Sequence, residues 1–494
     1  MLGVKLQGHD YKYEVAELLK LFTTQFKFIN SNDEFEKILI NEVIIKDKQI
    51  ESITKYYENK ELKICKSESF DTNLINKEDI KKGTKTIIKR SIFNVLDELF
   101  KTYVPWGILT GIRPVKIVHN LLDQGLSEED IRENLKNNYL IKDEKIDLAL
   151  DIAKRERVFI YPIDKNKISL YVSIPFCPTR CVYCSFPANP MKQFGHLRDK
   201  YVKALIKEIK GLAKLLKDTN KDIETLYIGG GTPTALEANQ LDVLIKALFE
   251  ELDLSNIKEF TVEAGRPDTI TKEKLEVMKK HNVTRISINP QTMNDETLKL
   301  IGRNHNSEDV KEKFKIAREL GFKDINMDMI IGLPGEGIKE AIKTANEIKE
   351  LNPDSLTVHG LSLKRGSRLY ENFILKKGLG IKPQDEISKM YEESRKLAND
   401  LELIPYYMYR QKNMVGNMEN VGYSKAGKEC IYNMQMIEDT QSIIALGADA
   451  VSKVVFREEN RIERFPNVKD VREYINRIDE MIEGKIDLLN TLYK

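Results

Sequence analysis

The sequence of 494 residues is long enough for two or three domains, and its 41% hydrophobic and 32% charged residues are typical of a globular protein. The 79 Lys and Arg residues nearly balance the 77 Asp and Glu residues, so no charge excess indicates a nucleic-acid or membrane-surface partner. No apolar run approaches the ~18 residues of a membrane span, and the N-terminus MLGVKLQGHDYKYEV turns polar too early for a signal peptide. Five cysteines, an odd number, favour free thiols in a reducing compartment, and we expect a cytoplasmic protein.

Residues 1–165 predict a separate α+β domain. The segments EKILINEVIIKDKQIESITKYY and KELKICKS alternate in polarity like antiparallel strands with one solvated face. TIIKRSIFNVLDELFKTYV and SEEDIRENLKNN follow as helical patterns, the second with Ser127 as the expected N-cap.

Residues 166–363 show a repeated strand–helix rhythm. Short β-branched runs are each followed by an amphipathic stretch such as RDKYVKALIKEIKGLAKLLK. The expected strands are Leu170–Phe176, Glu224–Ile228, Glu259–Glu263, Arg285–Asn289, Ile325–Ile331 and Ser355–His359. Such alternation predicts an α/β fold, a partial (β/α)6 barrel whose active site lies at the C-terminal ends of its strands. Residues 364–494 predict a mixed C-terminal extension that covers the substrate, with helices near 385–399 and 468–483.

Three of the five cysteines follow the first barrel strand. Cys177, Cys181 and Cys184 have C-x3-C-x2-C spacing in IPFCPTRCVYCSFP. A structural zinc site needs a fourth nearby Cys or His, and none is close in sequence. Thiolates bind iron–sulfur clusters, and three thiolates on a four-iron cluster leave one iron open to a small molecule. A zinc loop with a distant fourth ligand, or three buried structural thiols, is the competing interpretation.

The other expected strand ends carry residues suited to a polar ligand. YIGGGTP brings a glycine turn that lets the backbone approach a ligand closely. Carboxylates, an amide and an arginine follow at the later strand ends, and the guanidinium matches a carboxylate in bidentate fashion. The candidate residues are Gly230, Gly231, Thr232, Glu263, Gln291, Arg303 and Asp328. Each alone is more often a turn, cap or surface residue, so the indication is their joint placement.

The cysteine motif after the first strand of a partial barrel resembles the signature of radical S-adenosylmethionine enzymes. The resemblance implies a [4Fe–4S] cluster whose open iron binds S-adenosylmethionine. It also implies electron transfer from a low-potential donor such as flavodoxin or ferredoxin, and a 5′-deoxyadenosyl radical that abstracts hydrogen. The radical carries the chemistry, so no side chain is assigned as catalytic.

Longer motifs resemble the oxygen-independent coproporphyrinogen III oxidase (dehydrogenase) family over about residues 170–453. They are LYVSIPFCPTRCVYCSFP, YIGGGTPT, RISINPQTMNDETLKLIGRNH, NMDMIIGLPGE and MYRQKNM. WGILTGIRPVKIVHNLL and RQKNMVGNMENVGYSKAGKECIYNMQMIED are similar to the HemZ-type branch. The resemblance implies that S-adenosylmethionine and the cluster contact Tyr171, Tyr183, Gly230, Gly231, Thr232, Glu263, Gln291, Arg303, Asp328 and Ser362.

The family reaction is oxidative decarboxylation of two propionates to vinyl groups, so the resemblance implies a tetrapyrrole substrate and haem biosynthesis. Its carboxylates need cations, which LSLKRGSRLY and IPYYMYRQKNM supply, and we expect Arg365, Tyr409 and Arg410 to contact it. A solvated basic rim is the preferred interpretation of Lys364, Arg368 and Lys412.

Two departures keep other functions open. Phe186 stands where the oxidase branch has an extra cysteine, and CIYNMQM lacks the His and Trp of the haem-chaperone tail. The alternatives are a haem chaperone and an anaerobic haem-degrading methyltransferase; a tRNA-modifying radical enzyme is disfavoured by the balanced charge.

Overall fold

The computed structural model describes residues 1–30, 35–72, 77–111, 113–186, 189–218, 221–371 and 382–491. The chain divides into two compact units, an N-terminal unit (Met1–Leu150) and a barrel unit (Asp151–Lys494), and each is described by itself. Within the described ranges, no helix is long and apolar enough to cross a membrane.

The N-terminal unit contains a mixed sheet with strand order β2-β1-β3-β4-β5. Its strands are β1 (Leu2–Gln7), β2 (Phe26–Phe28), β3 (Lys37–Lys46), β4 (Gln49–Glu58) and β5 (Glu61–Asp71). The meander β3-β4-β5 is antiparallel, as predicted, whereas β1 pairs in parallel with both of its neighbours. Alternate residues of β4 are buried, which gives the sheet one apolar face.

Helices complete the core of the N-terminal unit. They are α1 (Lys12–Leu19), α2 (Lys77–Phe100), α3 (Val115–Asp123), α4 (Glu128–Tyr139) and the first residues of α5 (Asp143–Ile160). Ile88, Ile92 and Leu96 of α2 are buried at helical spacing in this core. The predicted N-cap is confirmed: the Ser127 hydroxyl accepts from the backbone N–H of Asp130 at 3.1 Å and completes a capping box.

The barrel unit is built on six adjacent parallel strands in its described part. They are β6 (Lys167–Ile174), β9 (Asp222–Gly230), β10 (Glu259–Gly265), β11 (Arg285–Ile288), β12 (Ile325–Ile331) and β13 (Ser355–Gly360). Each coincides with a predicted strand to within three residues at either end, and the predicted partial (β/α)6 barrel is confirmed. Ile168, Leu170 and Val172 of β6 are buried, as expected for a strand covered on both faces.

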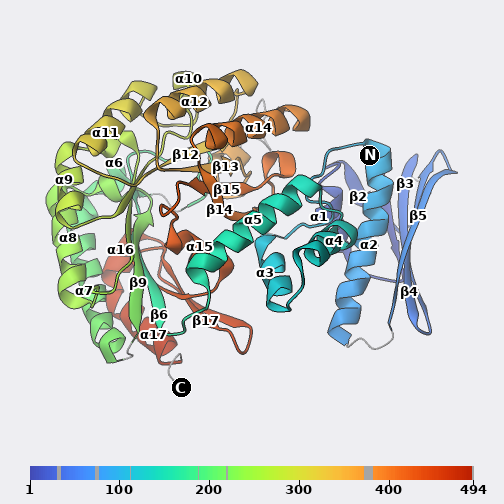
Figure 1. Cartoon of the computed structure of the whole chain (residues 1–494), viewed down its shortest axis with the longest axis horizontal. Helices are drawn as coiled ribbons and strands as arrows, with labels where there is room; N and C mark the ends of the chain where they lie inside the picture. Colours follow the sequence, from blue (N-terminus) through green and yellow to red (C-terminus); the bar gives the residue numbers. More distant parts are fainter. Residues whose placement is uncertain are drawn as a thin grey trace. The chain divides into compact units, whose positions relative to one another are not determined.

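Helices between these strands form the outer layer of the barrel (Figure 1). They are α7 (Arg198–Asp218), α8 (Ala238–Glu251), α9 (Lys272–Lys280), α10 (Asp295–Leu300), α11 (Ser307–Glu319) and α12 (Ile338–Leu351). Helix α7 buries Leu205, Ile209, Leu212 and Leu216, a spacing of three and four residues that places them on one face. Shorter pieces are β7 (Phe176–Cys177), β8 (Asn189–Pro190), α6 (Met191–Phe194), η1 (Gly195–Leu197), η2 (Pro233–Ala235), η3 (Pro267–Thr269) and η4 (Val415–Asn417).

The C-terminal extension continues the barrel sheet at both edges. Strand β15 (Asn420–Ser424) pairs with β13, and β14 (Ile404–Tyr409) pairs with β15. At the other edge β16 (Ser442–Leu446) is parallel to β6, followed by β17 (Val451–Phe456) and β18 (Arg461–Pro466). The accompanying helices are α14 (Gln384–Asp400), α15 (Ile431–Glu438), α16 (Val471–Asn476) and α17 (Ile478–Asn490). The helix predicted near 385–399 is present as α14, whereas the one predicted near 468–483 is divided at Arg477 into α16 and α17. The sequence analysis predicted neither α15 nor the strands.

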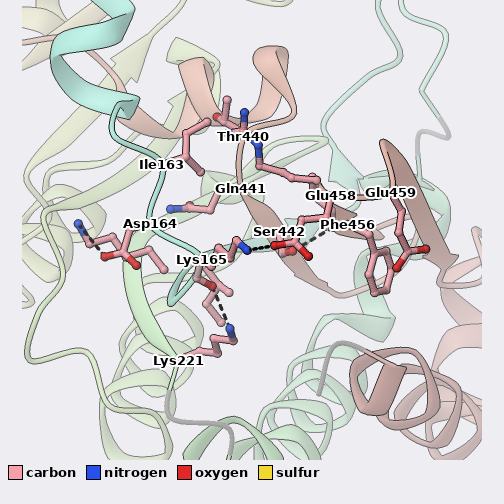
Figure 2. A pocket seen from close by; sticks show the side chains of 14 residues that line it. Ile163, Asp164, Lys165, Lys221, Thr440, Gln441, Ser442, Phe456, Glu458 and Glu459 are labelled. Atoms are coloured by element: carbon pink, nitrogen blue, oxygen red, sulfur yellow. Dashed lines mark hydrogen bonds and ion pairs between the residues drawn. The ribbon is translucent and has the colours of Figure 1, made fainter. Parts of the chain in front are cut away.

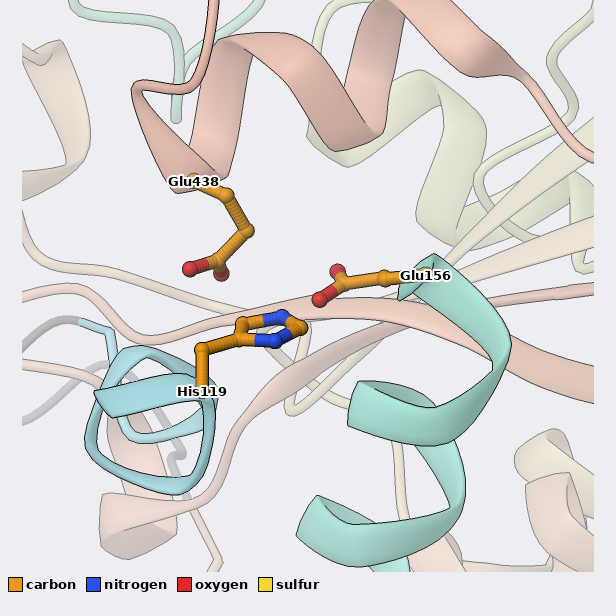
Figure 3. A group of neighbouring side chains, drawn as sticks. All are labelled: His119, Glu156 and Glu438. Atoms are coloured by element: carbon orange, nitrogen blue, oxygen red, sulfur yellow. The ribbon is translucent and has the colours of Figure 1, made fainter. Parts of the chain in front are cut away.

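The division between the units falls at residue 150. The sequence analysis placed it near residue 165, where the strand–helix rhythm begins. The second half of α5 packs against the C-terminal extension. Arg155 forms an ion pair with Glu429, and Ile160 packs in the cluster that holds Tyr406. The carboxylates of Glu156 and Glu438 lie near one another, with one oxygen of Glu156 within 4.8 Å of one oxygen of Glu438 (Figure 3). Burial, with the nearby Glu438, raises the pKa of Glu156 well above its usual range.

Candidate active site

The cysteine loop begins where β7 ends, and two other segments of the barrel unit hold its backbone. The N–H of Val182 donates to the carbonyl of Ile301 at 3.0 Å, and the N–H of Leu369 donates to the carbonyl of Val182 at 2.8 Å. The Thr179 hydroxyl donates to the carbonyl of Gly302 at 2.7 Å. The segment that follows α10 and the segment around Leu369 therefore hold the loop in place.

The three motif thiols line one cavity, which we call the cysteine cavity. All three are free and half-buried, whereas Cys65 is exposed and Cys430 is buried. Burial raises the pKa of Cys177 to about 11 and raises the pKa of Cys184 as well. A cysteine binds a metal as the thiolate. Because burial raises the pKa of these thiols, we expect their protons to leave when a metal cation binds. The cavity is lined by Cys177, Thr179, Arg180, Cys181, Tyr183, Cys184, Phe186, Gly230, Gly231, Thr232, Pro233, Glu263, Gly265, Arg266, Asn289, Gln291 and Arg303.

The glycine turn after β9 forms one wall of this cavity. Gly230 has φ +111°, which side chains rarely adopt, and a Cβ on Gly231 would lie 2.8 Å from the Cys177 sulfur. The Thr232 hydroxyl donates to that sulfur at 3.6 Å. The glycines are thus required for the backbone to approach the first thiol.

Acidic groups lie near the end of β10 and in the middle of β12. The Tyr227 hydroxyl donates to the Glu263 carboxylate. Burial and the nearby Asp328 raise the pKa of Glu263 to about 7, although the Tyr227 hydrogen bond acts in the opposite direction. Burial would also raise the pKa of Asp328, but His359, 3.7 Å away, and a 2.7 Å hydrogen bond from Asn326 leave it below its usual range. The two neighbouring carboxyl groups therefore have opposite protonation preferences.

Arg303 contributes a buried cation to the cysteine cavity. It is 5% exposed, and its Nη1 and Nη2 donate to the Tyr183 hydroxyl at 3.1 Å and to the Asn289 carbonyl at 2.6 Å. Its Nε is buried and has no hydrogen-bond partner among the described residues. A buried donor without a partner is costly, so this atom favours an anionic ligand in the cavity.

A second cavity, which we call the side cavity, adjoins the first. The two share Tyr183, Cys184, Phe186 and Gln291. The side cavity is lined by Tyr183, Cys184, Ser185, Phe186, Gln291, Ile330, His359, Gly360, Leu361, Ser362, Lys364, Tyr409, Gln411 and Asn420. Its cation is Lys364, whose ammonium lies 5.6 Å from the centre of the Phe186 ring. A ligand there would contact the cysteine loop and a positive charge together.

Comparison with known proteins places this site in a family. Residues 171–348 match the Radical SAM superfamily. The whole chain is 38% identical, over 500 aligned residues and 99% of the relative's length, to the oxygen-independent coproporphyrinogen-III oxidase-like protein HemZ of Bacillus subtilis (strain 168). The chain belongs to the HemZ family of radical SAM proteins. The predicted family resemblance is confirmed.

Two other relatives match a smaller share of this HemZ-family protein. Heme chaperone HemW of the same Bacillus strain is 33% identical over 63% of this chain and 76% of its own length. The Escherichia coli structure described as coproporphyrinogen III oxidase (HemN), a radical SAM enzyme, aligns with a TM-score of 0.52 at 24% identity, over 67% of this chain and 73% of that one. That structural similarity supports the fold.

Radical SAM proteins use a [4Fe–4S] cluster and S-adenosylmethionine, and the cysteine cavity of the HemZ-family chain fits both. Three thiols can hold the cluster. The Arg303 Nε without a partner suits the cosubstrate's carboxylate, and the glycine turn leaves room for a ligand against Cys177. The donor set therefore matches the group that the family uses.

The structure brings most of the residues proposed for the cosubstrate to the cysteine cavity. They are Tyr183, Gly230, Gly231, Thr232, Glu263, Gln291 and Arg303. Ser362 instead lines the side cavity. Asp328 faces a third cavity, shared with Tyr227, Glu263 and His359, inside the barrel. Tyr171 lines none of these three cavities, because its ring stacks on those of Tyr227 and Tyr432 at 6.2 and 6.1 Å.

The three residues proposed for substrate contact do not lie at one site in the structure. Tyr409 lines the side cavity, whereas Arg365 is exposed and lines none of the three. Arg410 is 5% exposed, and its Nη2 donates to the Asn417 side chain at 2.6 Å. Lys364, interpreted from sequence as a solvated rim residue, is the cation that lines the cavity.

Sequence reasoning also missed His359 and Arg266. His359 ends the sixth predicted strand, and its Nδ1 lies 3.5 Å from the Tyr409 hydroxyl. Its place at a strand end was a usable signal. Arg266 follows Glu263 by three residues, but an arginine at a turn has ordinary roles and gives no such signal.

A further cavity lies at the N-terminal ends of β6 and β16, away from the cysteines (Figure 2). Two of its lysines have partners: Lys165 pairs with Glu458, and the Lys221 ammonium donates to the Lys165 carbonyl at 2.9 Å. This end of a barrel usually contributes stability.

Proposed function

We propose that this protein is a radical SAM oxidoreductase that converts two propionates of a reduced tetrapyrrole, coproporphyrinogen III, to vinyl groups in haem biosynthesis. The single supporting observation is the side cavity, where Lys364 and the Phe186 ring lie beside the cysteine loop. A propionate-bearing macrocycle offers the matching carboxylate and apolar surface. The names of the HemZ and HemN relatives supply the substrate class.

The bound cluster and cosubstrate would supply the radical that removes one hydrogen from the propionate carbon next to the ring. The bond from the neighbouring carbon to the carboxylate then breaks, carbon dioxide leaves, and one electron passes to an acceptor. A low-potential donor such as flavodoxin or ferredoxin would provide the electron that starts each turnover. The chain's own residues hold the propionate and keep bulk water from the site.

Lys364 is the residue that we assign to the propionate. Burial lowers the pKa of its ammonium group, and a bound carboxylate would offset that loss of solvation. His359 and Tyr409 lie on the same cavity wall and offer further hydrogen-bond donors. A charge-assisted contact contributes roughly 1.5–3 kcal/mol, so Lys364→Met should weaken substrate binding by about ten- to a hundred-fold.

The test is anaerobic incubation with coproporphyrinogen III under reducing conditions, followed by mass analysis. Loss of two carbon dioxide units per molecule, slowed in Lys364→Met, is the expected result. Arg365→Met is the matched control, because Arg365 is exposed and adjacent in sequence. An unchanged substrate mass with an intact cluster would refute the decarboxylase, and an added methyl group would indicate a methyltransferase.

A haem chaperone is the second candidate. The 33% identical relative carries that name, and Phe186 stands, 59% exposed, where the oxidase branch has an extra cysteine. If the protein is a haem chaperone, we expect it to bind haem stoichiometrically and to leave the mass of coproporphyrinogen unchanged. Haem titration followed by absorbance, on the same protein used for the mass assay, distinguishes the two functions.

A further inference from the structure

Arg266 is a second buried arginine beside the cysteine loop, and protein groups hold it rigidly. It follows the end of β10 and is 5% exposed. Its Nε and Nη2 donate to the two carboxylate oxygens of Asp268 at 2.9 and 2.7 Å. This bidentate pair fixes the plane of the guanidinium, which a lysine could not reproduce.

The remaining nitrogen of Arg266 reaches into the cysteine motif. Nη1 donates to the backbone carbonyl of Thr179 at 3.0 Å and to its hydroxyl at 2.9 Å. The same nitrogen lies 3.8 Å from the sulfur of Cys181. Since Thr179 lies between Cys177 and Cys181, Arg266 contacts both the loop backbone and one of the thiols.

Arg303 and Arg266 differ in how many of their hydrogen-bond donors the protein already uses. Arg303 has an Nε without a partner among the described residues, whereas every nitrogen of Arg266 contacts the protein. Most of the N–H donors of Arg266 are therefore used within the protein. Its bonds orient the loop that carries the thiols.

The charge of Arg266 is balanced by one carboxylate, that of Asp268. His305 has a fully buried side chain 3.9 Å from Asp268. Burial and Arg303 lower the pKa of His305 to about 3, so this imidazole is neutral and does not compete for Asp268. The Asp268–Arg266 pair thus presents its guanidinium nitrogen to Cys181.

We infer that Arg266 is a positioning residue for the iron–sulfur cluster, and that it holds the cysteine loop and raises the reduction potential of the cluster through its contact with Cys181. Hydrogen bonds and positive charge near cluster sulfurs stabilise the more electron-rich, reduced state. The inference rests on cluster binding and is independent of which tetrapyrrole the protein acts on.

The experiment is a redox titration of the anaerobically reconstituted full-length protein, followed by electron paramagnetic resonance, together with iron analysis. Arg266→Gln should bind less iron than the natural protein, and the cluster that it retains should have a lower potential. We expect about a tenfold lower ratio of reduced to oxidised cluster at a fixed potential, equivalent to ~59 mV for a one-electron couple. Arg266→Lys keeps the charge but loses the fork, so it should recover part of the shift.

Lys274→Gln is the matched control. Lys274 is also a buried cation, 7% exposed, but its ammonium donates to the carbonyls of Thr234 and Thr269 and not to the cysteine loop. Its variant should keep the natural potential. Loss of iron in Arg266→Gln but not in Arg266→Lys or Lys274→Gln would also support the inference. An unchanged potential in Arg266→Gln, or equal loss of iron in all three variants, would overturn it.

Discussion

The Tyr227 hydroxyl donates a hydrogen bond to the Glu263 carboxylate, across the ends of two adjacent barrel strands. Burial, aided by Asp328, nevertheless raises the pKa of Glu263 from 4.5 to about 7. Between pH 4.5 and about 7, the Glu263 carboxyl group is therefore mostly protonated in the folded state and mostly ionised in the unfolded state. The stability it contributes is fully present below the unfolded pKa and is lost as the pH rises through about 7.

Glu263→Gln, which stays neutral at every pH, should remove this pH dependence. From roughly pH 5 to pH 8, the free energy of unfolding of the variant should rise by about 2.5 kcal/mol relative to that of the natural protein, without S-adenosylmethionine. Denaturant unfolding at the two pH values measures it. Tyr227→Phe removes the bond that lowers the pKa, so its transition should move to higher pH. Equal pH profiles for Glu263→Gln and the natural protein would contradict the prediction.

The three half-buried thiols should account for all of the cluster iron. Replacing Cys177, Cys181 and Cys184 together with Ala should abolish the roughly four irons per chain expected of such a cluster. Cys65→Ala should keep them, because Cys65 is exposed in the N-terminal unit. Cys430→Ser should keep them too, since this buried thiol donates to Glu259 at 3.1 Å, a bond that a serine preserves. Iron analysis with absorbance spectra provides the measurement, and iron retained by the triple variant would rule out the assignment.

The barrel was predictable because its strands are buried on both faces and read as continuous apolar runs. Ile325–Ile331 was predicted to the residue, since five of the seven residues in INMDMII are apolar and favour a buried strand. The cysteine triad was predictable from spacing alone. The strands of the C-terminal extension were not, because β15 (NVGYS) pairs with residues of β13 that lie 63 to 69 positions earlier, and its short sequence has no periodic signal.

Cations of the tail were the least predictable part of the site. Lys364 and Arg365 are adjacent in sequence, yet the first lines the side cavity and the second is exposed. Arg410 follows Tyr409, and the alternation of a strand sends one side chain to the cavity and the other away from it. Composition marks such a segment as basic, but only the tertiary structure decides which charge faces a ligand.

Arg303 should bind the cosubstrate through geometry as well as charge. Arg303→Lys keeps the charge but loses the planar fork, so S-adenosylmethionine affinity should fall about ten- to a hundred-fold. Arg410→Lys is the control, because Arg410 is equally buried but lines none of the three cavities. Calorimetric titration of the reconstituted protein compares the two. A similar loss in both variants would show that the effect comes from destabilisation.

A fully buried ion pair joins α7 to the last helix, and it should dominate the stability of this part of the barrel unit. The Lys485 ammonium contacts the Glu208 carboxylate, and both side chains are 0% exposed. Glu208 also accepts from the Tyr474 hydroxyl at 2.6 Å and from the N–H of Gly447 at 2.8 Å. Lys485→Met would leave the carboxylate buried without its cation, so we expect a loss of about 3–5 kcal/mol in free energy of unfolding. Adding Glu208→Gln should recover part of the loss, because the remaining donors then face a neutral acceptor. Urea denaturation of the natural protein, the two single variants and the double variant measures both effects, and additive losses in the double variant would mean that the pair is not coupled.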